Sequence, residues 1–143
     1  MCYSLYVSTD SSEDLSQRNS DLLRFERLVA DSTAPYDALL DFPNKWYVGS
    51  ESHCSCTFRH LHSVELGFGE PVDWYPEEQN EIEGTRWLYG VLAELVAAGC
   101  RVDLVDIWEG AAVDHVITLN VTLSAVSPVA FRLFENHKFR LGP

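Results

Sequence analysis

Residues 77–98 read EEQNEIEGTRWLYGVLAELVAA and predict one long helix, around which the rest of the fold can be arranged. Leu88, Leu92 and Leu95 recur at helical spacing, so they would form a single buried stripe. Acidic residues gather at the start of the segment, where they complement the positive end of the helix dipole. Gly99 follows directly and can adopt the left-handed backbone conformation that ends many helices. The segment therefore has a predicted start, a buried face and a predicted end.

Two strands are predicted directly after this helix. Residues 101–108 are mostly apolar, as in a strand that lies inside a sheet. Residues 115–125 alternate apolar and polar side chains, which is typical of a strand with one face toward solvent. Two consecutive strands without a helix between them exclude a purely parallel sheet, because parallel neighbours need a long crossover connection.

Further strands and two shorter helices are expected elsewhere in the chain. Runs of aromatic and β-branched residues predict strands at 2–9, 45–48, 53–61 and 138–141. A short helix is predicted after Ser20, where apolar residues follow helical spacing at Leu22, Phe25, Leu28 and Val29. Another is predicted at 128–136, because Ser127 can cap it and proline is favoured at the first helical position.

These elements predict an α+β fold with two layers. We expect a single domain over residues 1–143, with a mixed or antiparallel sheet of about five to six strands, one long helix and two shorter helices. The 143 residues are 46% hydrophobic, so the chain can bury a core unaided and disorder is not expected.

The strong acidity of the chain narrows the classes of partner. It carries 22 acidic and 10 basic residues, for a formal net charge of -12. Nucleic acids and anionic membranes require a basic surface, so neither is expected as a partner.

The N-terminus lacks the basic start and apolar run of a secretory signal, and no run approaches the ~18 apolar residues of a membrane span. The expected location is the cytoplasm, where thiols stay reduced.

One segment gathers side chains that can bind metal. Residues 53–62 read HCSCTFRHLH, and on a strand Cys54, Cys56, His60 and His62 would share one face. Two sulfurs and two nitrogens are a ligand set that zinc uses in tetrahedral sites. These four residues are therefore the candidate metal ligands, and zinc is the candidate ion.

The geometry of a regular strand conflicts with this site. Same-face neighbours on a strand lie ~6.6 Å apart, whereas two thiolates on one zinc lie about 4 Å apart. A bent turn at Cys54 and Cys56 can present two ligands, and Cys2, Cys100 or a histidine from elsewhere would complete the shell.

Two other interpretations of the cysteine pair remain open. Cys54 and Cys56 can simply pack in the core as small hydrophobic residues beside Phe58. Alternatively, His53 or His60 lowers the pKa of a thiol and makes the pair a redox or nucleophilic site.

Aromatic residues suggest a binding surface. Two adjacent pairs of large rings stand out, Trp46 with Tyr47 and Trp74 with Tyr75. Exposed tryptophan and tyrosine rings often mark binding sites. Packing in the core is the alternative interpretation for most of these four residues. The segment 131–140 is locally basic and aromatic, so it can dock on an acidic surface of its own domain or of a second copy, as in a homodimer.

Two acidic residues lie in the apolar segment 101–108. Asp103 and Asp106 cannot both point outward, so one of them is a candidate for partial burial and a raised pKa, which would suit an acid or base. No complete catalytic set can be assembled from spacing alone, so whether the protein is an enzyme stays open. The sequence favours a binding or assembly module. The alternative is a metal-binding, thiol-redox or hydrolytic site centred on residues 53–56.

Overall fold

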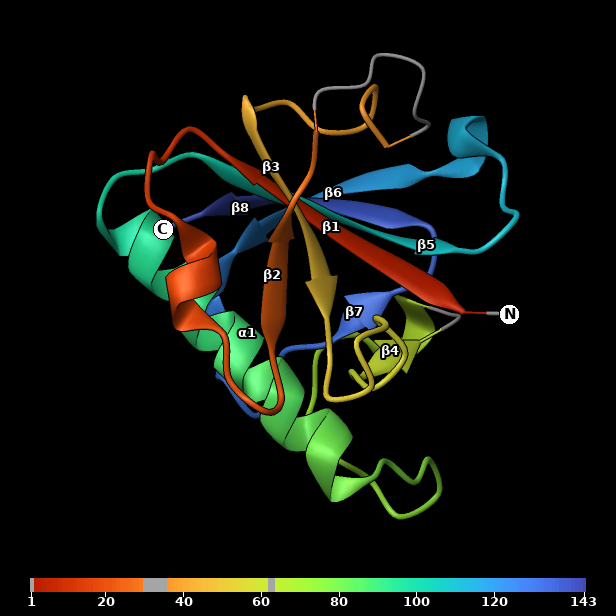
Figure 1. Ribbon diagram of the computed structural model, residues 1–143. Coiled ribbons are helices and arrows are strands. Elements are labelled where there is room, and N and C mark those ends of the chain that lie inside the picture. The colour runs from red at the N-terminus through yellow and green to blue at the C-terminus, as the bar shows by residue number, and fades with distance from the viewer. Residues whose placement is uncertain (1, 30–35, 62–63) are drawn as a thin grey trace.

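A six-stranded mixed sheet with one α-helix against it forms the fold of the computed structural model, which describes residues 2–29, 36–61 and 64–143 (Figure 1). In chain order, the strands of this sheet are β1 (Tyr3–Thr9), β2 (Arg24–Arg27), β3 (Asn44–Gly49), β5 (Val102–Trp108), β6 (Ile117–Thr122) and β8 (His137–Gly142). The helix is α1 (Gln79–Ala97). Two very short strands, β4 (His60–Leu61) and β7 (Leu133–Phe134), pair separately in parallel.

The strand order in the large sheet is β2-β3-β1-β5-β8-β6. Every neighbouring pair is antiparallel except β6 and β8, which run parallel and make the sheet mixed. The first strand lies between β3 and β5, with Leu5 opposite Val48 on one side and Asp106 on the other. The start of the chain is therefore held in the middle of the sheet.

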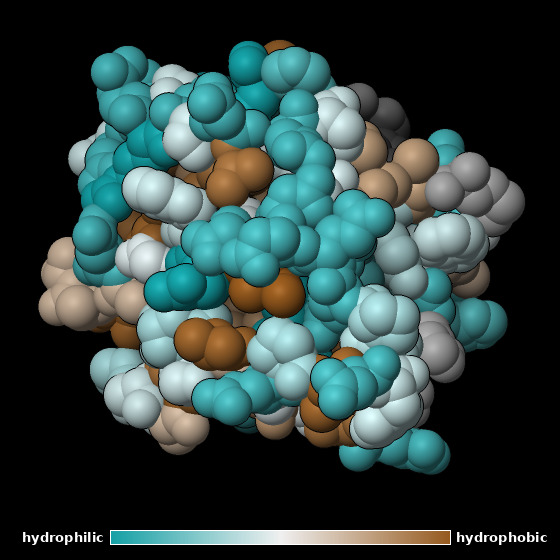
Figure 2. Space-filling view, turned by 90° about the horizontal axis from the view of Figure 1, so that it is seen from below, coloured by the Kyte–Doolittle hydropathy of each residue, from teal (hydrophilic) through white to brown (hydrophobic). Residues whose placement is uncertain are grey.

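The hydrophobic core lies between α1 and the sheet. On the helix Leu88, Leu92 and Leu95 are buried, which confirms the predicted stripe. They belong to the same core cluster as Leu5 and Val7 of β1. The view from below, toward the side of the sheet on which α1 lies, shows small hydrophobic patches separated by hydrophilic side chains (Figure 2).

The opposite face of the sheet is covered by the segment around residues 36–43. Its backbone N–H groups donate hydrogen bonds to the sheet, from Asp41 to Asp103 at 2.9 Å and from Phe42 to the Ser8 hydroxyl at 3.2 Å. Lys138 of β8 lies 3.4 Å from the same Asp103 carboxylate and 2.8 Å from that of Asp41. These polar contacts account for the burial of Asp103 in a mostly apolar strand.

The expected α+β class is confirmed broadly, but the two shorter helices are wrong. In the part of the chain that the structure describes, α1 is the only α-helix. It is accompanied by four isolated 3₁₀ turns at Leu15–Arg18, Val64–Leu66, Val113–His115 and Leu123–Ala125. Strands and turns form where both short helices are predicted, because hydrogen bonds to distant parts of the chain replace those of a helix.

Where the first short helix is predicted, after Ser20, the chain forms β2. The side chain of Asn19 accepts a hydrogen bond from the Phe25 backbone at 2.6 Å, and Ser20 N–H donates to Leu23 O at 2.8 Å, which together bend the chain. Phe25 then pairs with Val48 and is buried. Pairing along β3 therefore prevails over helical spacing.

Where the second short helix is predicted, at 128–136, the chain forms a turn, β7 and part of a second turn. Two backbone N–H groups that a helix would use internally instead bond to the segment around β4, from Leu133 to Arg59 O at 2.8 Å and from Glu135 to Leu61 O at 2.7 Å. Asn136 has a φ of 57°, which reverses the chain into β8.

The predicted strand at 53–61 is also wrong over most of its length. Only its last two residues form a strand, β4, and residues 50–59 form a compact loop that we call the thiol loop. Ser50 closes this loop, because its N–H and its hydroxyl both donate to Cys54 O at 2.7 Å. His53 has a φ of 65°, a left-handed conformation that no regular strand contains.

Candidate metal centre

The thiol loop is fastened to the central strands through Ser55. The buried Ser55 hydroxyl donates to Val48 O at 2.7 Å and accepts the Leu5 N–H at 2.9 Å. Val48 belongs to β3 and Leu5 to β1, so one side chain connects the loop to two neighbouring strands. The cysteines on either side of Ser55 are thereby brought to the N-terminal end of β1.

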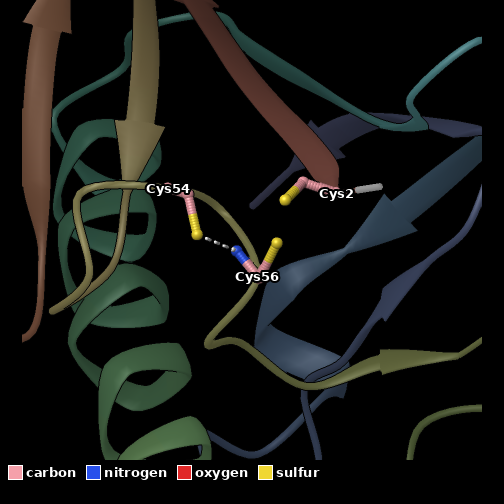
Figure 3. A group of neighbouring side chains, drawn as sticks. All are labelled: Cys2, Cys54 and Cys56. Carbon is pink, nitrogen blue, oxygen red and sulfur yellow. Dashed lines mark hydrogen bonds between the residues drawn. The ribbon is translucent and has the colours of Figure 1, made fainter.

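Three cysteines meet at this point. The sulfur atoms of Cys2, Cys54 and Cys56 all lie within 4.8 Å of one another, and Figure 3 shows them pointing into one small space. Each residue is partly buried. We call this group the Cys trio. Cys2 is fixed by Glu109, whose carboxylate accepts the Cys2 N–H at 3.2 Å and whose N–H donates to Cys2 O at 2.9 Å.

The spacing of the Cys trio suits a metal ion. Zinc–sulfur bonds of ~2.3 Å place thiolates about 4 Å apart, so the sulfurs need to move by less than about 1 Å to share one ion. The trio could thus hold a metal. The bent Cys54-Ser55-Cys56 turn supplies two of the sulfurs, and Cys2 is the residue that joins them. Sequence reasoning named Cys2 only as one of several alternatives, because nothing local links residue 2 to residue 54.

The surroundings shift the pKa values of Cys54 and Cys56 in opposite directions. Burial raises the pKa of Cys54, but the Ser52 hydroxyl at 3.1 Å and the Cys56 N–H at 3.5 Å outweigh this and leave its pKa lowered. Burial raises the pKa of Cys56 to about 12, helped by hydrogen bonds with the thiols of Cys2 and Cys54. The loop therefore makes the Cys54 thiol easier to deprotonate than the Cys56 thiol.

His60 supports the thiol loop and has no free ring nitrogen to bind metal. Its Nδ1 lies 2.6 Å from Asp106 Oδ2, and its Nε2 lies 2.6 Å from Ser55 O. A carbonyl oxygen only accepts, so Nε2 carries a proton and donates to the peptide between the two loop cysteines. The ring also stacks on Tyr3 with a centroid distance of 3.9 Å. His60 positions the loop.

The pair of His60 and Asp106 is buried in the core face of the sheet. Desolvation lowers the pKa of His60, but the Asp106 carboxylate outweighs it and raises the pKa above its usual value. Burial also raises the pKa of Asp106. Together the two groups hold one proton at the Nδ1–Oδ2 contact more tightly than either would in water. The sequence signal for this pair is the acidic residue inside an apolar strand.

The residue before His60 fixes the loop to the helix side of the molecule. The buried Arg59 guanidinium pairs with both oxygens of Glu77, at 2.8 and 2.9 Å, and donates to Gly69 O at 2.8 Å. Arg132 lies 3.4 Å from the same carboxylate and is also buried. Sequence reasoning missed this buried cluster of three charges, although it noted basic residues in the segment 131–140.

The remaining predicted metal ligands lie apart or outside the described residues. Cys100 follows the C-terminus of α1, where its N–H donates to Leu95 O at 3.0 Å, and it is not part of the trio. His53 is exposed at the tip of the thiol loop. His62 lies outside the residues that the structure describes.

The predicted aromatic surface divides between core and exterior. Trp46 is 1% exposed, packs edge-on against Phe25 and lies under the Arg27 guanidinium. Tyr47 and Tyr75 are half-buried, and only Trp74, 69% exposed, presents most of its ring to solvent. The aromatic residues of the segment 131–140 are buried: Phe131, Phe134 and Phe139.

Comparison with known proteins adds no relationship. No protein-family model matches the chain, and neither a curated protein nor a solved structure matches it. None of the helices in the described part of the chain is long and apolar enough to cross a membrane.

Proposed function

We propose that the protein binds a thiophilic metal ion, zinc in the first place, through the thiolates of the Cys trio. The observation that carries this proposal is the approach of three cysteine sulfurs, from two distant parts of the chain, to within 4.8 Å of one another. Thiolates are the preferred ligands of zinc and of other soft ions. A three-sulfur site leaves one position of tetrahedral zinc for water or another ligand. We propose a cytoplasmic location, where these thiols stay reduced.

The support for the trio by the surrounding structure favours a binding site over chance proximity. Ser55 ties the loop to β1 and β3, and His60 holds the peptide between the two loop cysteines. Ligands that are positioned before the ion arrives lose less conformational entropy when it binds. The partial exposure of each cysteine leaves the sulfurs open to an ion from solvent.

A metal titration of single variants tests the proposal. Reduced, metal-free protein is titrated with zinc against a chromogenic chelator, and cobalt is used in parallel because thiolate–cobalt charge transfer reports sulfur ligation. We expect one ion per chain, and at least about a tenfold loss of affinity in each of Cys2→Ser, Cys54→Ser and Cys56→Ser. Cys100→Ser is the matched control and keeps native affinity. Native protein that binds no zinc, or single variants that bind as the native chain does, would contradict the proposal.

A second candidate function is self-association through the outer face of α1. Trp87 is 55% exposed and lines an open groove of about 630 Å³ together with Gly90 of the same helix. Both signs of charge flank this groove, at Arg18, Glu83, Arg86 and Glu94. Within one copy, Glu94 pairs with Arg18 and Arg86 with Glu83. With a two-fold axis near Gly90, Arg86 of each copy would also approach Glu94 of the other, so that these charges of the two copies would be complementary. The occupant we propose is therefore a second copy of the chain.

Sedimentation at several protein concentrations tests this assembly. We expect a dimer that Trp87→Ala shifts to monomer, whereas Trp74→Ala, which removes another exposed tryptophan outside the groove, leaves it intact. A native protein that stays monomeric at all concentrations would rule it out.

A further inference from the structure

The Cys trio has the arrangement of a dithiol pair beside a third thiol. Cys54 and Cys56 are separated by one residue on a bent segment, and the Cys56 N–H lies 3.5 Å from the Cys54 sulfur (Figure 3). The sulfur of Cys56 lies within 4.8 Å of the sulfurs of both Cys2 and Cys54. Cross-linking requires the two side chains to point toward each other, and the sulfurs of Cys54 and Cys56 lie within 4.8 Å of each other.

The surroundings distinguish Cys54 as the reactive sulfur. The Ser52 hydroxyl lies 3.1 Å from its Sγ, and the Cys56 N–H donates to the same atom at 3.5 Å. Two polar groups thus meet this one sulfur, and we assign it as the attacking atom of the pair. The thiol loop is partly open to solvent at this residue, so a small oxidant can reach it.

We propose that the Cys trio is a reversible redox switch, in which a hydroperoxide oxidises Cys54 and Cys56 to a disulfide. In the first step, the Cys54 thiolate attacks the terminal oxygen of the hydroperoxide. The O–O bond breaks, Cys54 becomes a sulfenic acid, and the leaving alkoxide or hydroxide takes up a proton. In the second step, the Cys56 sulfur attacks Cys54, the S–S bond forms, and the sulfenic oxygen leaves as water with the proton of Cys56. Two thiols lose two electrons, and one hydroperoxide gains them.

The disulfide would control the metal site. Oxidation removes two of the three sulfur donors and leaves Cys2 alone, so the ion is released. A ring closed over a single intervening residue is strained, and strained disulfides are the ones that cellular thiols reduce most readily. This consequence rests on the proposed metal binding, whereas the oxidation itself requires only the thiols.

Peptide mapping of the metal-free protein tests the oxidation. Reduced protein is stripped of metal, treated with hydrogen peroxide, alkylated and digested with trypsin. Cys54 and Cys56 fall in one peptide, 46–59, so their disulfide appears as this peptide without alkylation and lighter by two hydrogen atoms. We expect this product in native protein and in the Cys2→Ser and Cys100→Ser variants. Cys54→Ser should slow the loss of thiols at least about tenfold, and dimedone should trap a sulfenic acid at Cys54 in Cys56→Ser.

Three results would overturn the switch. They are a cross-link between Cys2 and the peptide 46–59 as the main product, oxidation of Cys54→Ser at the native rate, and no disulfide at all. In a parallel experiment, zinc-loaded protein should release zinc to a chelator at the rate at which the disulfide forms. Disulfide formation in a protein that binds no zinc would refute only the proposed function. Zinc binding without faster oxidation at Cys54 would refute only the switch.

Discussion

Two adjacent residues at the end of the thiol loop, Arg59 and His60, hold it through different kinds of charged contact. Arg59 points to the helix side and joins two guanidinium groups to the one carboxylate of Glu77. His60 points to the central strands and shares one proton with Asp106. The two arginines of the first cluster keep their charges, because arginine does not lose its proton in proteins. The second can change its charge with pH. The chain thus keeps its fixed charges toward the helix and places its titratable pair beside the cysteines.

Each cluster leaves one buried atom without a partner among the described residues. In the arginine cluster this atom is Arg132 Nε, and in the histidine pair it is Asp106 Oδ1. Two positive groups around one carboxylate also leave an excess of positive charge in the interior. Removing the carboxylate of Glu77 should therefore lower the free energy of unfolding more than altering the pair of His60 and Asp106, which holds one proton between two groups.

The largest effect is expected at Glu77. Glu77→Ala leaves Arg59 and Arg132 buried without a counter-charge, and breaking a buried ion pair in this way costs about 3–5 kcal/mol. The free energy of unfolding from urea titration measures the loss. Glu78→Ala is the control, because Glu78 is exposed and makes no capping hydrogen bond. A loss at Glu77 as small as at Glu78 would show that the buried cluster contributes little.

A smaller effect is expected at Asp106. Asp106→Asn keeps the shape of the side chain but replaces a charged hydrogen bond to His60 by a neutral one, which should cost about 1–3 kcal/mol. Because His60 holds the Ser55 carbonyl, zinc affinity should fall as well. The control is Asp114→Asn at an exposed position. If stability falls and zinc affinity does not, His60 has no part in positioning the cysteines.

The same pair predicts a dependence of stability on pH. The pKa values of His60 and Asp106 are both raised in the folded protein, so the native state binds more protons than the unfolded chain. The stabilisation from His60 is complete below its unfolded pKa of about 6.5 and is lost as pH rises through the folded pKa. Glu81, Glu135 and His137 are the other titratable groups whose charges reach the pair.

Urea titrations from pH 6 to pH 9 test this dependence. The free energy of unfolding should fall with rising pH by at most about 1.4 kcal/mol per pH unit for one proton. In Asp106→Asn the slope should flatten, because His60 loses the carboxylate that raises its pKa. If the free energy of unfolding changes with pH equally steeply in native and variant protein, groups other than His60 and Asp106 cause the pH dependence.

The smallest effect concerns two glycines of α1. A Cβ at Gly84 would lie 3.3 Å from Leu22 O and 3.4 Å from Thr57 O, so the helix and the thiol loop approach closely there. A Cβ at Gly90 would meet nothing within 4 Å. Gly90→Ala should therefore raise the free energy of unfolding by about 1 kcal/mol, because alanine has the higher helix propensity. Gly84→Ala should raise the free energy of unfolding by less than this, or lower it. Equal gains, measured by thermal or urea unfolding, would contradict a close approach at Gly84.

The elements that sequence analysis predicted correctly have a pattern that fits one kind of element only. The leucine stripe of α1 has helical spacing, the segment of β5 is a mostly apolar run, and the runs of aromatic and β-branched residues at β1 and β3 are typical of strands; the structure confirms these elements. The segment after Ser20 shows where such prediction fails, because its apolar spacing fits a helix although the segment forms strand β2. Its strand depends on hydrogen bonds to β3, a partner that follows many residues later.

The candidate site shows the same limit more strongly. The metal-ligating residue types at Cys54 and Cys56 were visible in the sequence, and geometry already required a bend between them. That Cys2 joins them follows from the place of β1 in the sheet, which no local pattern encodes. The role of His60 was missed because it depends on Asp106, which lies far along the chain on β5.

The central position of β1 also constrains the order of events during synthesis. Tyr3 pairs across from Trp108, so β1, which is synthesised before β5, has no partner on that side until α1 and β5 have been made. Contacts between residues so far apart in sequence form slowly, because a long loop must close before they stabilise the chain. Glu109, directly after β5, holds Cys2 in place, so we expect Cys2 to take its final position beside the other two sulfurs only once residues up to 109 have been synthesised.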